Sequence, residues 1–113
     1  MLKQRYQRYL ITIENLYKVL ITVIGLIFFL HLCACSFIAI GHIATTDQLN
    51  TTQWIERSGI QFGQYRQIYV TALYFTTTTI TTIGYGDYSG VTVVEKLFII
   101  FLLFAGILCF TLI

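Results

Sequence analysis

The sequence predicts an all-α membrane protein in which two transmembrane helices flank a re-entrant helix and loop. Three observations support this fold class. Hydrophobic residues make up 57% of the 113 residues, charged residues make up 11%, and proline is absent. Two apolar segments each reach the roughly 20 residues that a helix needs to cross the hydrocarbon core of a bilayer. Between them lies a Thr-rich segment that is too short to cross.

The composition also narrows the classes of function. A chain of 113 residues forms at most one domain, and its net charge of +2 argues little for nucleic acid as a partner. Soluble domains carry about 25% charged residues, so we expect a lipid bilayer to be the solvent. The cysteines lie in apolar runs without the spacing of metal ligands or disulfides, which predicts free thiols at Cys33, Cys35 and Cys109. No residue set indicates an enzyme or a bound cofactor.

Residues 1–18 predict a basic amphipathic helix that lies in the membrane interface. Lys3, Arg5 and Arg8 stand against a single acid, Glu14, and by the positive-inside rule this cluster places the N-terminus in the cytoplasm. Apolar residues recur at helical spacing on other faces, at Leu2, Tyr6, Tyr9, Ile13, Leu16 and Leu20.

Residues 19–41 predict the outer transmembrane helix, because they contain no charged residue unless His31 is protonated. Residues 42–67 are polar and predict an extracellular loop with a short helical turn around Trp54. Within this loop, Asn50 begins an Asn-Thr-Thr triplet that fits the N-glycosylation acceptor pattern.

Residues 68–81 are apolar and Thr-rich, and they predict a short helix that does not cross the membrane. Residues 91–113 predict the inner transmembrane helix, with Glu95 and Lys96 near its beginning. No polar flank follows Ile113, so we expect this helix to be truncated and the chain to be a fragment of a larger protein.

The run TTTTITTIGYGD, from Thr76 to Asp87, admits three interpretations. A β-hairpin would leave unpaired strand edges in the bilayer. A phosphate-binding loop would need a third glycine and a following lysine, and a lone G-x-G is a weak signal. The remaining interpretation is a short helix followed by an extended segment, in which Gly84 and Gly86 take backbone angles that let successive carbonyls point the same way. Irregular backbone at membrane depth must be buried in protein or line water, which predicts an oligomer.

Thr82-Ile83-Gly84-Tyr85-Gly86-Asp87 resembles the selectivity filter of potassium channels, T-V-G-Y-G-D, with Ile in place of Val. The order of elements is similar to the pore module of voltage-gated potassium channels. The residues around 69–76, the HLCAC run at 31–35 and the EKLF run at 95–98 resemble the ether-à-go-go branch, which is related to cyclic-nucleotide-gated channels. This branch usually has G-F-G-N where this chain has GYGD, and several potassium channels carry an acid where this chain has Thr78.

This resemblance implies a homotetramer whose filter binds K⁺ through four rings of backbone carbonyls. The implied K⁺ ligands are Thr82, Ile83, Gly84 and Tyr85, and Gly86 completes the filter. Asp87 lies at the outer mouth in this resemblance, where it concentrates cations or bonds to the pore helix; a turn-capping role is the alternative. The implied supports of the filter are Tyr74, Phe75, Thr78 and Thr81.

Several residues keep two interpretations from sequence alone. Thr81 faces the central cavity or packs behind the filter, and Gly106 is a gating hinge or a close-packing position. Glu95 is expected to cap the inner helix rather than to act in permeation. His31 is expected to be a neutral histidine that hydrogen-bonds between helices, with a gating role as the alternative. Most Thr hydroxyls of residues 76–82 are expected to bond carbonyls of the preceding turn or a neighbouring helix.

The sequence therefore predicts passive K⁺ conduction by a multi-pass protein, most simply in the plasma membrane. Its expected partners are lipid, K⁺ and three identical or homologous subunits. Lys3, Arg5 and Arg8 are compatible with the end of a voltage sensor, and cyclic-nucleotide modulation is compatible with the branch. A non-selective cation channel and a non-conducting accessory membrane subunit are the alternative functions.

Overall fold

The computed structural model describes residues 1–43, 54–61 and 63–113, and these residues fold into helices joined by turns and extended segments. The helices are α1 (Leu2–Ile43), α2 (Trp54–Arg57), α3 (Tyr65–Ile80) and α4 (Val93–Leu112). The all-helical fold class is therefore confirmed for the described residues, which contain no strand. Asn50 and its glycosylation pattern lie outside them.

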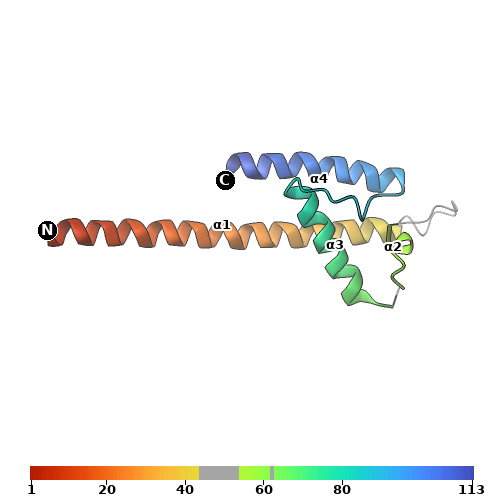
Figure 1. Cartoon of the computed structure of the whole chain (residues 1–113), viewed down its shortest axis with the longest axis horizontal. Coiled ribbons are helices and arrows are strands. Elements are labelled where there is room, and N and C mark those ends of the chain that lie inside the picture. The colour runs from red at the N-terminus through yellow and green to blue at the C-terminus, as the bar shows by residue number, and fades with distance from the viewer. Residues whose placement is uncertain (44–53, 62) are drawn as a thin grey trace.

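α1 and α4 are long and apolar enough to cross a membrane and they run antiparallel, so that the C-terminus lies beside the middle of α1 (Figure 1). We call the end of the molecule where α1 ends and α4 begins the loop end, and the opposite end the N-terminal end. With 42 residues, α1 is about 63 Å long, roughly twice the thickness of the hydrocarbon core.

The structure runs residues 1–18 and 19–41 together as one helix, without a break at the boundary predicted from the sequence. The change at this boundary is one of charge, and charge alters the surroundings of a helix rather than its backbone. Proline, which would break a helix, is absent. Just before the boundary, Glu14 and Lys18 form an ion pair at 2.9 Å, and their i,i+4 spacing stabilises a continuous helix. Whether residues 1–18 lie in the membrane interface stays a prediction.

α3 crosses α1 near the loop end and contacts both α1 and α4. From the end of α3, the chain returns to the loop end as an extended trace before α4 begins (Figure 1). The Thr residues of α3 donate hydroxyl hydrogen bonds to carbonyls three or four residues earlier, from Thr76, Thr77, Thr78 and Thr79. The expected bonding to the preceding turn is confirmed, and it explains how a β-branched run is accommodated in a helix.

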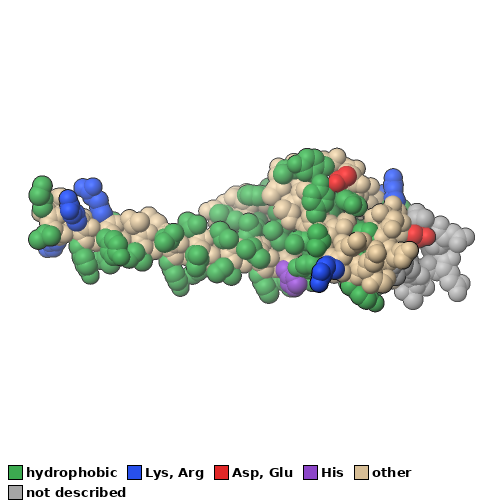
Figure 2. Space-filling view, turned by 60° about the horizontal axis from the view of Figure 1, so that its bottom comes forward, with side chains coloured by type: hydrophobic (Ala, Val, Ile, Leu, Met, Phe, Trp, Pro, Cys, Tyr) green, Lys and Arg blue, Asp and Glu red, His purple; other side chains and the backbone are tan. Residues whose placement is uncertain are grey.

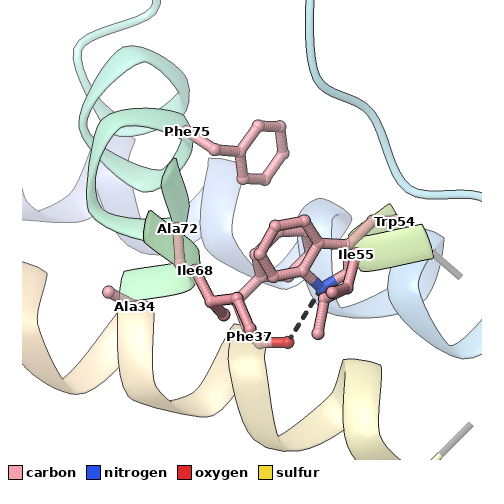
Figure 3. Packing of buried hydrophobic residues seen from close by; sticks show 7 residues of the cluster. All are labelled: Ala34, Phe37, Trp54, Ile55, Ile68, Ala72 and Phe75. Carbon is pink, nitrogen blue, oxygen red and sulfur yellow. Dashed lines mark hydrogen bonds between the residues drawn. The ribbon is translucent and has the colours of Figure 1, made fainter. Parts of the chain in front are cut away.

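The hydrophobic core lies at the loop end, where the end of α1 meets α2 and α3 (Figure 3). Phe37 is its centre, since its ring stacks on Trp54 at 4.6 Å and on Phe75 at 4.7 Å between centroids. The Trp54 indole N–H also donates to the Phe37 carbonyl oxygen at 3.3 Å. The rest of the core is small or aliphatic: Ala34, Ile55, Ile68 and Ala72.

Exposure changes sharply along the molecule. Every residue from Met1 to Gly25 is exposed, although most are apolar, whereas buried residues of α1 begin at Ala34. Figure 2 shows this N-terminal stretch as a rod with hydrophobic side chains along it and Lys and Arg side chains at its tip. The fold of a single chain is therefore held together at the loop end.

Candidate functional site: the TIGYGD segment

The TIGYGD segment, residues 82–87, is held by backbone hydrogen bonds to the C-terminal turn of α3. The amide of Thr82 donates to the Thr79 carbonyl at 3.1 Å, and the amides of Ile83 and Gly84 donate to the Thr78 carbonyl at 3.0 and 3.1 Å. These carbonyls belong to the last turn of α3. Carbonyls in that position have no amide partner within the helix, so they are free to accept hydrogen bonds from the segment. The first three N–H groups of the segment thus bond to the helix, and among the described residues no backbone amide is found to bond to the carbonyls of the segment.

The backbone of the segment alternates in handedness. Thr82, Gly84 and Gly86 have φ angles of +63°, +55° and +77°, whereas the residues between them do not have positive φ. In a regular strand, carbonyls alternate between the two sides; reversing the sign of φ at every second residue lets them point to one side. A positive φ is a strained conformation for a β-branched residue such as Thr82, and strain of this kind concentrates at functional sites.

Every residue of the TIGYGD segment is exposed in the single chain. Backbone carbonyl oxygens are ligands for hard cations, and a row of them without competing hydrogen bonds favours a cation over an anion. Among the described residues, no group of three or more His, Cys, Asp and Glu side chains is placed to hold a metal ion. Any cation bound here would therefore be held mainly by backbone.

Tyr74 supports the segment from α3. Its ring stacks on Tyr85, with centroids 6.4 Å apart and planes 2° apart, and meets Tyr88 edge-on at 6.1 Å. The Asp87 carboxylate raises the pKa of the Tyr74 phenol, first through a side-chain hydrogen bond that favours the protonated phenol. Asp87 also accepts the amide hydrogen of Tyr88 at 3.0 Å. The Asp87 side chain thus interacts with both the Tyr74 phenol of α3 and the amide that follows it, and its role at the outer mouth stays a prediction.

The other predicted supports act differently. Phe75 is buried in the core against Phe37 rather than beside the segment's tyrosine. Thr78 supports the segment through its backbone carbonyl, because its hydroxyl donates within α3 to the Phe75 carbonyl. Thr81 is half-buried and its hydroxyl donates to the Thr77 carbonyl at 2.6 Å.

Gly106 of α4 lies against the end of α3. A Cβ atom at this position would stand 3.1 Å from the Ile80 carbonyl oxygen and 3.2 Å from the Ile80 Cα. These distances are tighter than ordinary van der Waals contact, so the absence of a side chain lets the two backbones approach just before the TIGYGD segment. The close-packing interpretation of Gly106 is confirmed, and the hinge role stays a prediction.

Two further residues connect the helices around the site. His31 of α1 hydrogen-bonds the Tyr69 hydroxyl of α3 through Nδ1 at 2.7 Å, which confirms the expected bond between helices. Glu95 lies in the first turn of α4 and forms a capping box with Thr92, which confirms the expected cap. Its carboxylate also accepts the amide hydrogen of Trp54 at 3.3 Å, a contact that the sequence did not predict. These residues are 41 positions apart, and no local pattern signals such a contact.

Comparison with known proteins identifies the class to which this arrangement belongs. Residues 2–113 match the family of ion transport proteins. The chain is 33% identical over 91 residues to the voltage-gated inwardly rectifying potassium channel KCNH2 of Cavia porcellus, covering 71% of this chain and 7% of that protein. It is 31% identical over 111 residues to the voltage-gated delayed rectifier potassium channel KCNH5 of Homo sapiens, covering 80% of this chain and 11% of that protein. The chain therefore spans a small part of the length of these relatives.

Proposed function

The chain belongs to the ion transport protein family, and we propose that four copies of it form a potassium-selective pore across a membrane. The observation that carries this proposal is the alternation of positive φ at Thr82, Gly84 and Gly86. Together with the amide hydrogen bonds to α3, it leaves a row of backbone carbonyls without partners in the segment. Rings of such carbonyls can replace the hydration shell of K⁺, which is how potassium channels select their ion.

In this proposal α3 is a pore helix that enters the membrane from the loop end and the TIGYGD segment returns to it. The C-terminal end of a helix carries about half a negative charge, so α3 would favour a cation just below the segment. Asp87 would add negative charge at the outer end of the pore. The K⁺ ligands are then the carbonyls of Thr82, Ile83, Gly84 and Tyr85.

The need for further subunits follows from exposure. A non-helical segment at membrane depth must be covered by protein or line water, yet residues 82–87 are all exposed in one chain. Behind the segment lies a hollow of about 350 Å³, lined in part by Phe75 and Thr79 of α3 and by Ile99 and Leu103 of α4. Neighbouring copies around a four-fold axis would cover one side of the segment and leave its carbonyls facing a shared path.

The orientation and setting are also part of the proposal. Lys and Arg side chains lie at the N-terminal end (Figure 2), and they include Lys3, Arg5 and Arg8. By the positive-inside rule they support a cytoplasmic N-terminal end and a loop end outside the cell. We propose that the pore is part of a longer voltage-gated channel, because the relatives are named as such channels. A location in the plasma membrane is a further part of this proposal.

The test is a reversal-potential measurement on the chain reconstituted in planar bilayers, with K⁺ exchanged for Na⁺ on one side. We expect the potential to follow K⁺ in the unmodified chain. Gly84→Ala should abolish current or selectivity, because φ of +55° strains any residue with a Cβ and displaces the carbonyls.

Gly59→Ala is the matched control. Gly59 has a φ of +74° and open space around its Cα, as Gly84 has, but it lies outside the TIGYGD segment. The backbone cost of the two substitutions is therefore similar, and only Gly84→Ala should change selectivity. Equal permeation of Na⁺ and K⁺ by the unmodified chain would favour a non-selective cation channel. The absence of current, with no four-fold assembly on crosslinking, would favour an accessory membrane subunit.

A further inference from the structure

The carboxylate of Glu95 is completely buried, with an exposed fraction of 0%, in a chain that has few charges. Burying an unpaired charge is costly unless hydrogen bonds replace its hydration. The ion pair between Glu14 and Lys18 is the only salt bridge among the described residues, so no cation neutralises Glu95 there. The carboxylate is instead held by backbone amides and by the positive end of the α4 dipole.

These amides come from two separate parts of the chain. Oε2 accepts the amide hydrogens of Val91 at 2.7 Å and Thr92 at 3.1 Å, immediately before α4. Oε1 accepts the amide hydrogen of Trp54, the first residue of α2, at 3.3 Å. A capping box requires only the contacts between Glu95 and Thr92. The contact with Trp54 has no role in capping α4, and it joins two segments that are far apart in the sequence.

Trp54 is itself fixed to α1. Its ring stacks on Phe37 and its indole N–H donates to the Phe37 carbonyl. Gly41 allows this approach, because a Cβ there would stand 2.7 Å from the indole nitrogen. Glu95 therefore connects the beginning of α4, through Trp54, to the end of α1.

The segment between Asp87 and α4 is held on both sides. At its beginning, Tyr88 packs against the core and against the Tyr74 ring. At its end, Val91 and Thr92 bond to Glu95. Gly90 fits closely between these contacts, since a Cβ there would stand 3.2 Å from the Glu95 Cβ and 2.7 Å from the Ile99 side chain.

We propose that Glu95 is a positioning residue that fixes the outer end of the TIGYGD segment by joining α2, residues 88–92 and α4 through one buried carboxylate. We call this set of contacts, among Trp54, Val91, Thr92 and Glu95, the carboxylate latch. The latch is a property of the chain itself. Its consequence for conduction rests on the proposed potassium pore: with the latch lost, the outer end of the filter is released while α3 still holds the inner end.

The first experiment measures amide hydrogen exchange in the full chain in lipid nanodiscs, for the unmodified protein and for Glu95→Ala. Loss of the carboxylate should accelerate exchange about tenfold or more in both residues 54–61 and residues 88–94, because a hydrogen bond to a charged group is lost in each. Exchange in α3 should not change. The emission of Trp54, which is the only tryptophan of the chain, should shift to longer wavelength as α2 loosens.

Three variants make this test specific. Glu56→Gln alters an exposed acid in α2 and should leave exchange and fluorescence unchanged. Thr92→Val removes the hydroxyl that caps α4 but keeps the Glu95 carboxylate, so residues 88–94 should loosen while α2 does not. Glu95→Gln keeps one carbonyl oxygen and should give an intermediate result. It also keeps the size of the side chain, so it provides the test if Glu95→Ala does not fold.

Acceleration confined to residues 88–94, with unchanged Trp54 emission, would overturn the latch and reduce Glu95 to a local cap. Recordings on the same variants in planar bilayers separate this failure from a failure of the proposed function. If the unmodified chain selects K⁺, Glu95→Gln should conduct K⁺ for a shorter time per opening, whereas Glu56→Gln should not. If exchange reports the latch in a chain that does not select K⁺, the latch stands and the potassium pore does not.

Discussion

The loop end and the N-terminal end are built from the same helix but differ in how a single chain packs them. Near the loop end, α1 buries Ala34, Phe37 and Gly41 against α2 and α3. At the N-terminal end, the first 25 residues are all exposed, although apolar residues are frequent there. Apolar composition is therefore not what decides burial in this protein. The difference lies in whether segments from elsewhere in the chain return to contact α1.

This difference separates two sources of stability. At the loop end, aromatic stacking and a buried carboxylate hold segments together within one chain. At the N-terminal end, apolar side chains such as Leu16 and Phe28 face outward, where lipid or neighbouring copies would cover them. Substitutions at the loop end should therefore break contacts between segments of the single chain, whereas those at the N-terminal end should break none.

The largest effect is expected from a pair of identical substitutions in α1. Phe37→Ala removes a ring that is 1% exposed and stacks on three other rings. We expect it to lower the free energy of unfolding by about 3–5 kcal/mol. Phe28→Ala, nine residues earlier at a site 62% exposed, should change it by about 0.5 kcal/mol or less.

Thermal unfolding in one detergent, followed by circular dichroism, measures both variants. Equal contributions of the two phenylalanines to the free energy of unfolding would contradict the proposed difference between the two ends. A similar loss for both would mean that the N-terminal end has intrachain contacts in solution, or that detergent replaces the core at the loop end.

A smaller effect is expected from two glycines of the same helix. Alanine at position 41 would place its Cβ 2.7 Å from the Trp54 indole nitrogen, whereas position 25 has no atom within 4 Å. Overpacking costs about 1–3 kcal/mol, and replacing a helical glycine by alanine gains about 1 kcal/mol. We therefore expect Gly41→Ala to be destabilising by up to about 2 kcal/mol and Gly25→Ala to be stabilising by up to about 1 kcal/mol.

Chemical denaturation in mixed micelles gives the sign of each change. Opposite signs for the two substitutions would support a tightly packed loop end and an open N-terminal end. If Gly41→Ala were also stabilising, the indole would have to move aside without loss. Stacking between Trp54 and Phe37 would then not be the constraint that holds α2 on α1.

The sequence allows the helices and the local bonds of the site to be predicted, because their causes are local. Hydropathy and length predict the two apolar helices, residues 68–81 overlap closely with α3, and the Thr hydroxyls bond within one turn as expected. Glu95 is recognisable as a cap because an acid near the beginning of an apolar helix offsets the helix dipole.

The contacts that organise the loop end are not local, and for that reason sequence patterns do not predict them. Trp54 and Phe37 are 17 positions apart and Trp54 and Glu95 are 41 apart, so no periodicity relates them. Phe75 neighbours Tyr74 in the sequence, but neighbouring residues on a helix face different directions, so the two rings stack on different partners. Tyr74 turns toward Tyr85 and Phe75 turns toward Phe37.

The smallest effect is expected at the boundary between the packed core and the exposed TIGYGD segment. The Asp87 carboxylate raises the pKa of Tyr74 above its ordinary value of 10.0. A raised pKa means that the protonated phenol is the form stabilised by folding, so this stabilisation is present below pH 10.0 and is lost as the pH rises through the raised value. Asp87→Asn should lower the pKa of Tyr74 toward its ordinary value.

Tyrosinate absorbance, taken as the difference between each protein and its Tyr74→Phe version, isolates this residue among the tyrosines. An unchanged Tyr74 titration in Asp87→Asn would mean that the hydrogen bond to Asp87 does not join the segment to α3. The exposed segment would then be held to the packed end only by its backbone hydrogen bonds and by the stacking of Tyr85 on Tyr74.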